Sequence, residues 1–135
     1  MGGELEQLSK NMNLTNRVNF TGFAGGDLKS SAYHGAELLI VPSRHEAMSI
    51  VALEAAITGT PVLLTDQCGF KQLAEAGAAI EAPATADGLA QGLLTLLKNP
   101  VRLKKMGDRG RTYARENYTW DIAARKHINL FYRLL

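Results

Sequence analysis

Two carboxylates, Glu46 and Glu54, have the residue type and spacing most suggestive of chemistry in this chain. They lie eight residues apart in a strand-to-helix segment that runs from Pro42 to Pro61. In a helix that begins at Glu46, eight residues correspond to about 80° beyond two full turns and to a rise of about 12 Å. Both acids then face one groove, one near the helix N-terminus and one two turns further in. Such a groove suits a long polar ligand that lies across the N-terminus of a helix.

Each carboxylate also has a structural explanation. Ser43 and Glu46 have the S-x-x-E spacing of a capping box, which would place both at the start of the helix. Glu54 lies among apolar residues, which predicts a buried helix on which a carboxylate needs a hydrogen-bonding partner. That partner is either another side chain or a ligand hydroxyl. The sequence leaves both open, and the ligand hydroxyl is the sharper hypothesis.

Composition excludes several other classes of protein. The 135 residues are 46% hydrophobic and 21% charged with a net charge of +2, as in one ordinary globular domain that has no affinity for nucleic acid. A single cysteine, Cys68, rules out an internal disulfide and favours a reducing, cytoplasmic location. No run of about 18 apolar residues is present to cross a membrane. His45 lacks a second histidine at H-E-x-x-H spacing, so no metal site is expected.

The elements that must position the two acids alternate along the chain. Short apolar runs predict strands, and the longer segments between them have helical periodicity. This alternation predicts an α/β fold, a Rossmann-like parallel sheet flanked by helices on both faces. The expected strands are 17–21, 37–41, 62–65 and 78–81, and the expected helices are 4–11, 27–34 (with Asp27 as a candidate cap), 46–58, 70–76, 85–97, 100–117 (as one or two helices) and 120–134.

These patterns together resemble the C-terminal donor-binding domain of retaining GT-B glycosyltransferases, and most closely the glycosyl transferase group 1 family. The resemblance extends over nearly the whole chain. Besides Glu46-x7-Glu54, it rests on the segments V-N-F-T-G-F at 18–23, Y-H-G-A-E at 33–37, G-x-P-V at 59–62, N-P-x5-M-G at 99–107 and Y-T-W at 118–120.

The resemblance implies the roles of particular residues. Glu46, the candidate catalytic residue, would contact hydroxyls of the transferred sugar, and Glu54 would accept hydrogen bonds from the ribose. The donor would be a UDP- or GDP-sugar with a hexose-type sugar, the acceptor a glycan or a lipid-linked molecule, and no metal would be needed. Gly22 and Phe23 would lie near the base, and backbone N–H groups of 47–49 near the sugar or the phosphates. The full donor-binding set is Gly22, Phe23, Ser43, Glu46, Ala47, Met48, Ser49, Val51, Glu54 and Gly69.

The chain departs from the family pattern in three ways. Ala47, Met48 and Ser49 stand where the family has a Gly-Phe-Gly sequence, and Gln72 stands where it has an acid. The family's first βα unit and its N-terminal acceptor lobe have no counterpart, so 1–135 is expected to be one truncated domain. The predicted strand 17–21 would therefore lack its usual neighbours, which predicts rearranged strand pairing, a domain swap or a homodimer through an open strand edge.

Several interpretations of the whole protein stay open. The acceptor lobe could be supplied in cis or in trans. The chain could instead be a non-catalytic subunit or scaffold that completes a partner glycosyltransferase, and a sugar-nucleotide epimerase is a weaker alternative. Segment 98–115 contains seven basic residues and one acid, which is typical of a solvated helix but also allows contact with the inner face of a membrane.

Overall fold

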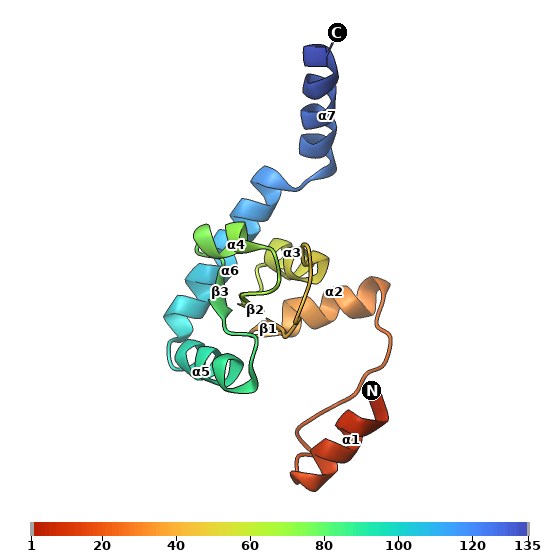
Figure 1. Cartoon of the computed structure of the whole chain (residues 1–135), viewed down its shortest axis with the longest axis vertical. Helices are drawn as coiled ribbons and strands as arrows, with labels where there is room; N and C mark the ends of the chain where they lie inside the picture. The colour runs from red at the N-terminus through yellow and green to blue at the C-terminus, as the bar shows by residue number, and fades with distance from the viewer. Residues whose placement is uncertain (1, 135) are drawn as a thin grey trace.

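A computed structural model describes residues 2–134 of the chain (Figure 1). The predicted α/β class is confirmed: strands and helices alternate through the central part of the molecule. In chain order the elements are α1 (Gly2–Asn11), α2 (Gly26–Gly35), β1 (Leu39–Val41), α3 (Ile50–Thr58), β2 (Val62–Thr65), α4 (Lys71–Glu75), β3 (Ala79–Ala82), α5 (Ala86–Leu97), α6 (Pro100–Asn117) and α7 (Trp120–Leu134).

The three strands form one parallel sheet in the order β1-β2-β3. The central strand β2 is buried along its whole length, and its side chains alternate between two cores. Val62 and Leu64 pack with residues of α3 and α4 on one face, whereas Leu63 packs with Leu96 of α5 and Met106 of α6 on the other. The sheet is therefore covered on both faces, as a parallel sheet requires.

Small residues bring α6 close to α3. Gly110 and Ala114 of α6 lie against the buried alanines of α3, and a Cβ atom on Gly110 would meet Ala56 at 3.4 Å. Gly107 lies closer still, because a Cβ atom there would come within 2.0 Å of the Gly59 carbonyl oxygen. This crossing fixes the C-terminal end of α3, the helix that carries Glu54.

The expected strand 17–21 does not form. Residues 18–25 have no regular secondary structure and run between α1 and α2, away from the sheet (Figure 1). A strand needs a neighbour to satisfy its backbone N–H and C=O groups, and among the described residues this segment has no strand beside it. The prediction of rearranged pairing is also wrong, because the three strands pair in chain order and leave β1 as an edge strand.

The starts of α2 and α3 correct the prediction. The N-cap of α2 is Gly25, and Asp27 lies in the first turn rather than at the cap. Helix α3 begins at Ile50 instead of Glu46, so the estimate of 80° and 12 Å between the two acids does not apply. Nor is α3 buried all round: Ala52, Ala55 and Ala56 are fully buried, whereas Ile50 is 67% exposed.

The two terminal helices extend away from the sheet at opposite ends of the molecule (Figure 1). Helix α7 follows α6 and has no buried residue. None of the helices described in 2–134 combines the length and the apolar character needed to cross a bilayer.

Candidate functional site

The candidate site lies in the loops that follow β1 and β2. Neighbouring parallel strands end at the same edge of the sheet, where ligands commonly bind in α/β proteins. Backbone and side-chain contacts join the two loops: the Glu46 N–H donates to the Gln67 carbonyl at 3.1 Å, and the Thr65 hydroxyl donates to the Ser43 carbonyl. The half-buried Glu46 side chain accepts a hydrogen bond from the Ser43 hydroxyl at 2.9 Å. Glu46 is thus held at the carboxyl edge of the sheet by contacts to both loops.

Gly69 allows these loops to pack closely. Its φ is +59°, a left-handed conformation that favours glycine. A Cβ atom at this position would lie 2.2 Å from the Ala47 carbonyl oxygen and 2.7 Å from that of Glu46. The structure therefore gives Gly69 a packing role, and its predicted contact with a donor stays a prediction.

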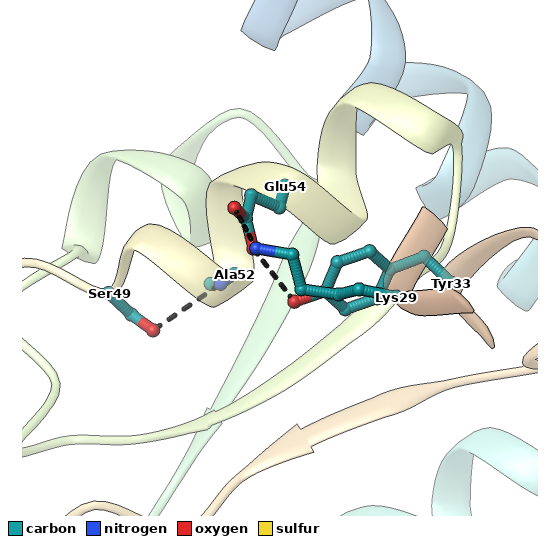
Figure 2. A network of polar contacts seen from close by, with 5 residues as sticks. All are labelled: Lys29, Tyr33, Ser49, Ala52 and Glu54. Atoms are coloured by element: carbon teal, nitrogen blue, oxygen red, sulfur yellow. Dashed lines mark hydrogen bonds and ion pairs between the residues drawn. The ribbon is translucent and has the colours of Figure 1, made fainter. Parts of the chain in front are cut away.

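The start of α3 corrects the predicted capping box. Ser49 is the N-cap, and its hydroxyl accepts a hydrogen bond from the Ala52 N–H at 3.4 Å (Figure 2). Ser43 and Glu46 bond to each other instead of to a helix terminus, because the link to Gln67 holds this segment as a loop. The first N–H groups of α3, those of Ile50 and Val51, precede its first helical hydrogen bond, which runs from Leu53 to Ser49.

Glu54 projects from α3 towards α2, where two side chains reach its two oxygens (Figure 2). Lys29 Nζ lies 2.6 Å from Glu54 Oε1, and the Tyr33 hydroxyl donates to Oε2 at 2.9 Å. The side chains of Lys29 and Glu54 remain 39% and 33% exposed. Glu54 therefore has the structural partner that the sequence left open, while its carboxylate still reaches solvent.

The electrostatics of this trio keep Glu54 ionised. The hydrogen bond from Lys29 lowers the pKa of Glu54; partial burial opposes the shift and the Tyr33 hydrogen bond adds to it. Burial, together with the adjacent carboxylate, raises the pKa of Tyr33 to about 12. At neutral pH the site consequently presents a carboxylate beside a neutral phenol. Glu54 can only accept hydrogen bonds in this state, which suits a ligand hydroxyl.

The two predicted acids do not share the cavity beside Glu54. That cavity, of about 190 Å³, is lined by residues of α2 and α3, including Lys29, Ser30, Tyr33 and Thr58, and Glu46 is not among them. Glu46 and Glu54 instead belong to two separate hydrogen-bond networks.

The other residues predicted to contact the sugar donor do not lie together. Ala47, Met48 and Val51 are exposed around the start of α3, whereas Ser49 is fully buried. Gly22 and Phe23 lie in the segment between α1 and α2, and Phe23 is 94% exposed. The structure places both residues outside the cavity beside Glu54, and their role near a base stays a prediction.

The sequence did not single out Lys29 and Tyr33 as site residues. They are four residues apart on α2, which puts them on one face of the helix. The four-residue spacing of a cation and a phenol was the only signal in the sequence for these two residues. It does not identify Glu54 as their partner, because that contact depends on the packing of α2 against α3.

Cys68 has a structural environment. Its fully buried sulfur lies 3.4 Å from the Thr65 hydroxyl and donates to the Val41 carbonyl at 3.6 Å. The sulfur is therefore shielded from solvent and belongs to the packing of the core. Within residues 2–134, no three His, Cys, Asp or Glu side chains gather in a way that could hold a metal ion.

Comparisons with known proteins agree with this geometry. The model of the family "Glycosyl transferases group 1" matches residues 2–113. An uncharacterised glycosyltransferase of Methanocaldococcus jannaschii is 29% identical over 129 residues, which cover 94% of this chain and 33% of that protein. D-inositol 3-phosphate glycosyltransferase of Rhodococcus erythropolis is 29% identical over 123 residues, covering 89% of this chain and 27% of the relative.

Solved structures give the same result. Sucrose-phosphate synthase from Thermosynechococcus elongatus superposes with a TM-score of 0.87 at 27% identity. The superposition covers 97% of this chain and 33% of the synthase chain. WaaG, a glycosyltransferase involved in lipopolysaccharide biosynthesis, superposes with a TM-score of 0.79 at 26% identity. The superposition covers 93% of this chain and 34% of the WaaG chain. The chain thus spans about a third of the length of these relatives. Because the family model matches most of its residues, the chain belongs to the glycosyl transferases group 1 family.

Proposed function

We propose that this chain is the nucleotide-sugar-binding part of a retaining glycosyltransferase that transfers a hexose-type sugar from a UDP- or GDP-sugar to a glycan or lipid-linked acceptor. Residues 1–135 would form one lobe, and the acceptor lobe would come from another part of the same protein or from a partner. The proposed setting is the cytoplasm, at the inner face of the membrane where the acceptor is lipid-linked. The free buried thiol of Cys68 supports a reducing compartment.

The observation that carries the proposal is that the Glu54 carboxylate is ionised, partly exposed and still able to accept hydrogen bonds. An ionised carboxylate has about four lone-pair positions, and Lys29 and Tyr33 use one on each oxygen. The carboxylate remains partly exposed next to a cavity of about 190 Å³. Two hydroxyl groups on neighbouring carbons, such as those of a ribose, could therefore donate to Glu54 without displacing its protein partners.

The loop before α3 supports the remaining contacts of the donor. The unbonded N–H groups at the start of α3 and the positive end of its dipole favour a phosphate group. Glu46 lies just before this helix and could accept hydrogen bonds from the sugar. We assign Glu46 to positioning the transferred sugar rather than to covalent attack.

Calorimetric titration of the chain with UDP, GDP, ADP and their common sugar conjugates tests the proposal. We expect one nucleotide to bind, and we expect Glu54→Gln to weaken that binding at least about tenfold, because a hydrogen bond to a charged group contributes roughly 1.5–3 kcal/mol. Glu75→Gln is a matched control, since Glu75 is an exposed acid whose recorded partner is Lys71 at 3.6 Å. Equal weakening by both variants, or tight binding in Glu54→Gln, would contradict the role of Glu54.

The second candidate function is a non-catalytic subunit or scaffold that completes a partner glycosyltransferase. It is favoured by Phe23, which is 94% exposed, lies outside the cavity beside Glu54 and could contact a partner. The same titration separates the two proposals, because a scaffold would bind none of the nucleotides. Consumption of a UDP-sugar without an acceptor would instead favour the epimerase alternative.

A further inference from the structure

A second cavity lies at the opposite edge of the sheet from the loops around Glu46. It has a volume of about 400 Å³ and is bordered by the turn between α4 and β3, the start of β3 and the first half of α6. Gly77 and Ile80 contribute from the turn and the strand, and Asn99 from the N-cap of α6. Because Ala79 begins β3, this cavity is at the amino edge of the parallel sheet, whereas the loops after β1 and β2 are at the carboxyl edge.

One wall of the cavity is strongly basic. Arg102, Lys105 and Arg109 line it from α6. At about 100° per residue these three positions fall within about 60° of the helix circumference, and they extend over about 10 Å along its axis. No carboxylate belongs to the lining; Asp108 of the same helix lines neighbouring cavities instead. The cavity therefore concentrates three positive charges without a compensating acid.

Within residues 2–134, no other protein group engages these cationic side chains. Across residues 2–134, the recorded hydrogen bonds and ion pairs include none made by the side chains of Arg102, Lys105 or Arg109. Arg111 on the same helix behaves differently, since its guanidinium donates to the Thr58 carbonyl at 2.7 Å. Arg111 thus stabilises the end of α3, whereas the N–H groups of the three cavity residues remain available to a ligand.

The position of Arg109 is set by the fold. A Cβ atom on Gly77, whose φ is +69°, would come within 2.6 Å of Arg109 Nη1 and 3.4 Å of its Cδ. The absence of a side chain at Gly77 therefore gives the guanidinium room to lie over the α4–β3 turn. At the other end of the cavity, the N-terminus of α6 adds the positive end of an 18-residue helix.

We propose that this cavity binds a small anion that carries phosphate groups. The guanidinium groups of Arg102 and Arg109 each offer paired N–H donors that match phosphate oxygens. The ammonium group of Lys105, which lies between the two arginines along α6, adds a third positive charge. Three uncompensated charges favour a multiply charged group, such as a pyrophosphate or a phosphate ester, over a single carboxylate. The volume is within the usual range for small-molecule sites. Because this cavity shares no lining residue with the cavity beside Glu54, the proposal does not depend on the proposed function.

Inorganic pyrophosphate is the first probe, titrated into the full chain in a phosphate-free buffer of low ionic strength. Calorimetry measures affinity, and amide NMR shifts of Gly77 and Arg102 report the location. We expect saturable binding that Lys105→Ala and Arg109→Gln each weaken at least about tenfold, because each removes a charge-assisted contact. Lys104→Ala and Arg115→Gln are the matched controls: they remove the same charges from α6 outside the cavity and should change affinity less than about twofold.

The outcomes distinguish a specific binding site from nonspecific electrostatic attraction of pyrophosphate to a basic helix. Equal weakening by controls and cavity variants would overturn the proposal, as would the absence of saturable binding. Lys105→Ala keeps the test valid if Arg109→Gln disturbs the turn at Gly77, and thermal unfolding of each variant checks the fold.

Co-sedimentation with phosphatidylcholine vesicles, with and without phosphatidic acid, identifies the source of the phosphate. A soluble anion is expected to bind without sedimentation of the chain. Sedimentation that requires phosphatidic acid, Lys105 and Arg109 would assign the same site to a lipid headgroup. Sedimentation unaffected by the two substitutions would overturn the assignment.

Discussion

The contacts of Glu54 join two helices and leave its carboxylate beside a cavity. Its bonds to Lys29 and Tyr33 join α2 to α3, and its carboxylate still faces a cavity. Sequence reasoning correctly required a partner for this acid but could not name it. The partners come from a helix more than 20 residues earlier, and only the packing of α2 on α3 brings them together.

The acid stability of the chain should depend on Glu54. Its pKa is lowered in the folded protein, so the stabilisation is present above the ordinary pKa and is lost as pH falls through the lowered value. We expect Glu54→Gln to reduce the free energy of unfolding by about 0.5–1 kcal/mol at neutral pH, because the pair is partly exposed. Urea unfolding of both proteins as a function of pH should show this difference shrinking as pH falls below the ordinary pKa of a glutamate. A difference that does not change with pH would contradict the ionic contribution.

Gly69 provides a second prediction at the scale of one residue. Gly69→Ala should lower the free energy of unfolding by about 2–4 kcal/mol, because it combines a left-handed backbone with a clash against the Ala47 carbonyl. Gly22→Ala is the matched control, since Gly22 has a φ of +66° but open space around it. We expect the control to lose only about 1–2 kcal/mol, the cost of the left-handed conformation. Equal losses by urea unfolding would show that the loop contact at Gly69 adds nothing.

At the scale of elements, the parts of the fold that could be predicted from the sequence are those with strong local signals. The strands β1, β2 and β3 come from apolar runs bounded by turns, and α5, α6 and α7 come from long periodic segments. The start of α3 could not be predicted, because Ser43 and Ser49 are both acceptable caps locally. The contact between Glu46 and Gln67, which is distant in sequence, makes Ser49 the cap. Segment 17–21 has the composition of a strand but no neighbour with which to pair.

The crossing of α3 and α6 gives a prediction about two neighbouring glycines. Gly107→Ala should destabilise the chain by about 1–3 kcal/mol, because its Cβ would overlap the Gly59 carbonyl and force a backbone shift. Gly110→Ala, nearly one turn further along α6, meets Ala56 only at 3.4 Å and gains helix propensity of up to about 1 kcal/mol. Urea unfolding should therefore rank Gly110→Ala well above Gly107→Ala in stability. The reverse order would mean that α6 does not approach α3 as closely as described.

At the scale of the whole molecule, the apolar surface is unevenly distributed. The central sheet is covered on both faces, whereas α7 extends from the body with no buried residue (Figure 1). Trp120 and Phe131 are 90% and 63% exposed, and their positions place them about 20° apart around the helix. Ile128, Leu130 and Leu134 are also exposed. An apolar helix face of this kind favours association, with another part of a longer protein, a partner or a second copy.

The chain by itself should consequently self-associate in a concentration-dependent way through α7. Trp120 is the only tryptophan, so its fluorescence reports this helix directly: emission should be typical of a solvated indole in dilute solution and should shift to shorter wavelength as association covers the ring. Phe131→Gln should weaken association measured by light scattering, because it removes an aromatic side chain from the apolar face. Asn129→Gln is the control, since position 129 lies about 160° away around the helix. A chain that stays monomeric at all concentrations would contradict association through this face and through an open strand edge alike. Equal loss of association in both variants would exclude the α7 face and leave the open edges of β1 and β3 as the surfaces for the predicted dimer.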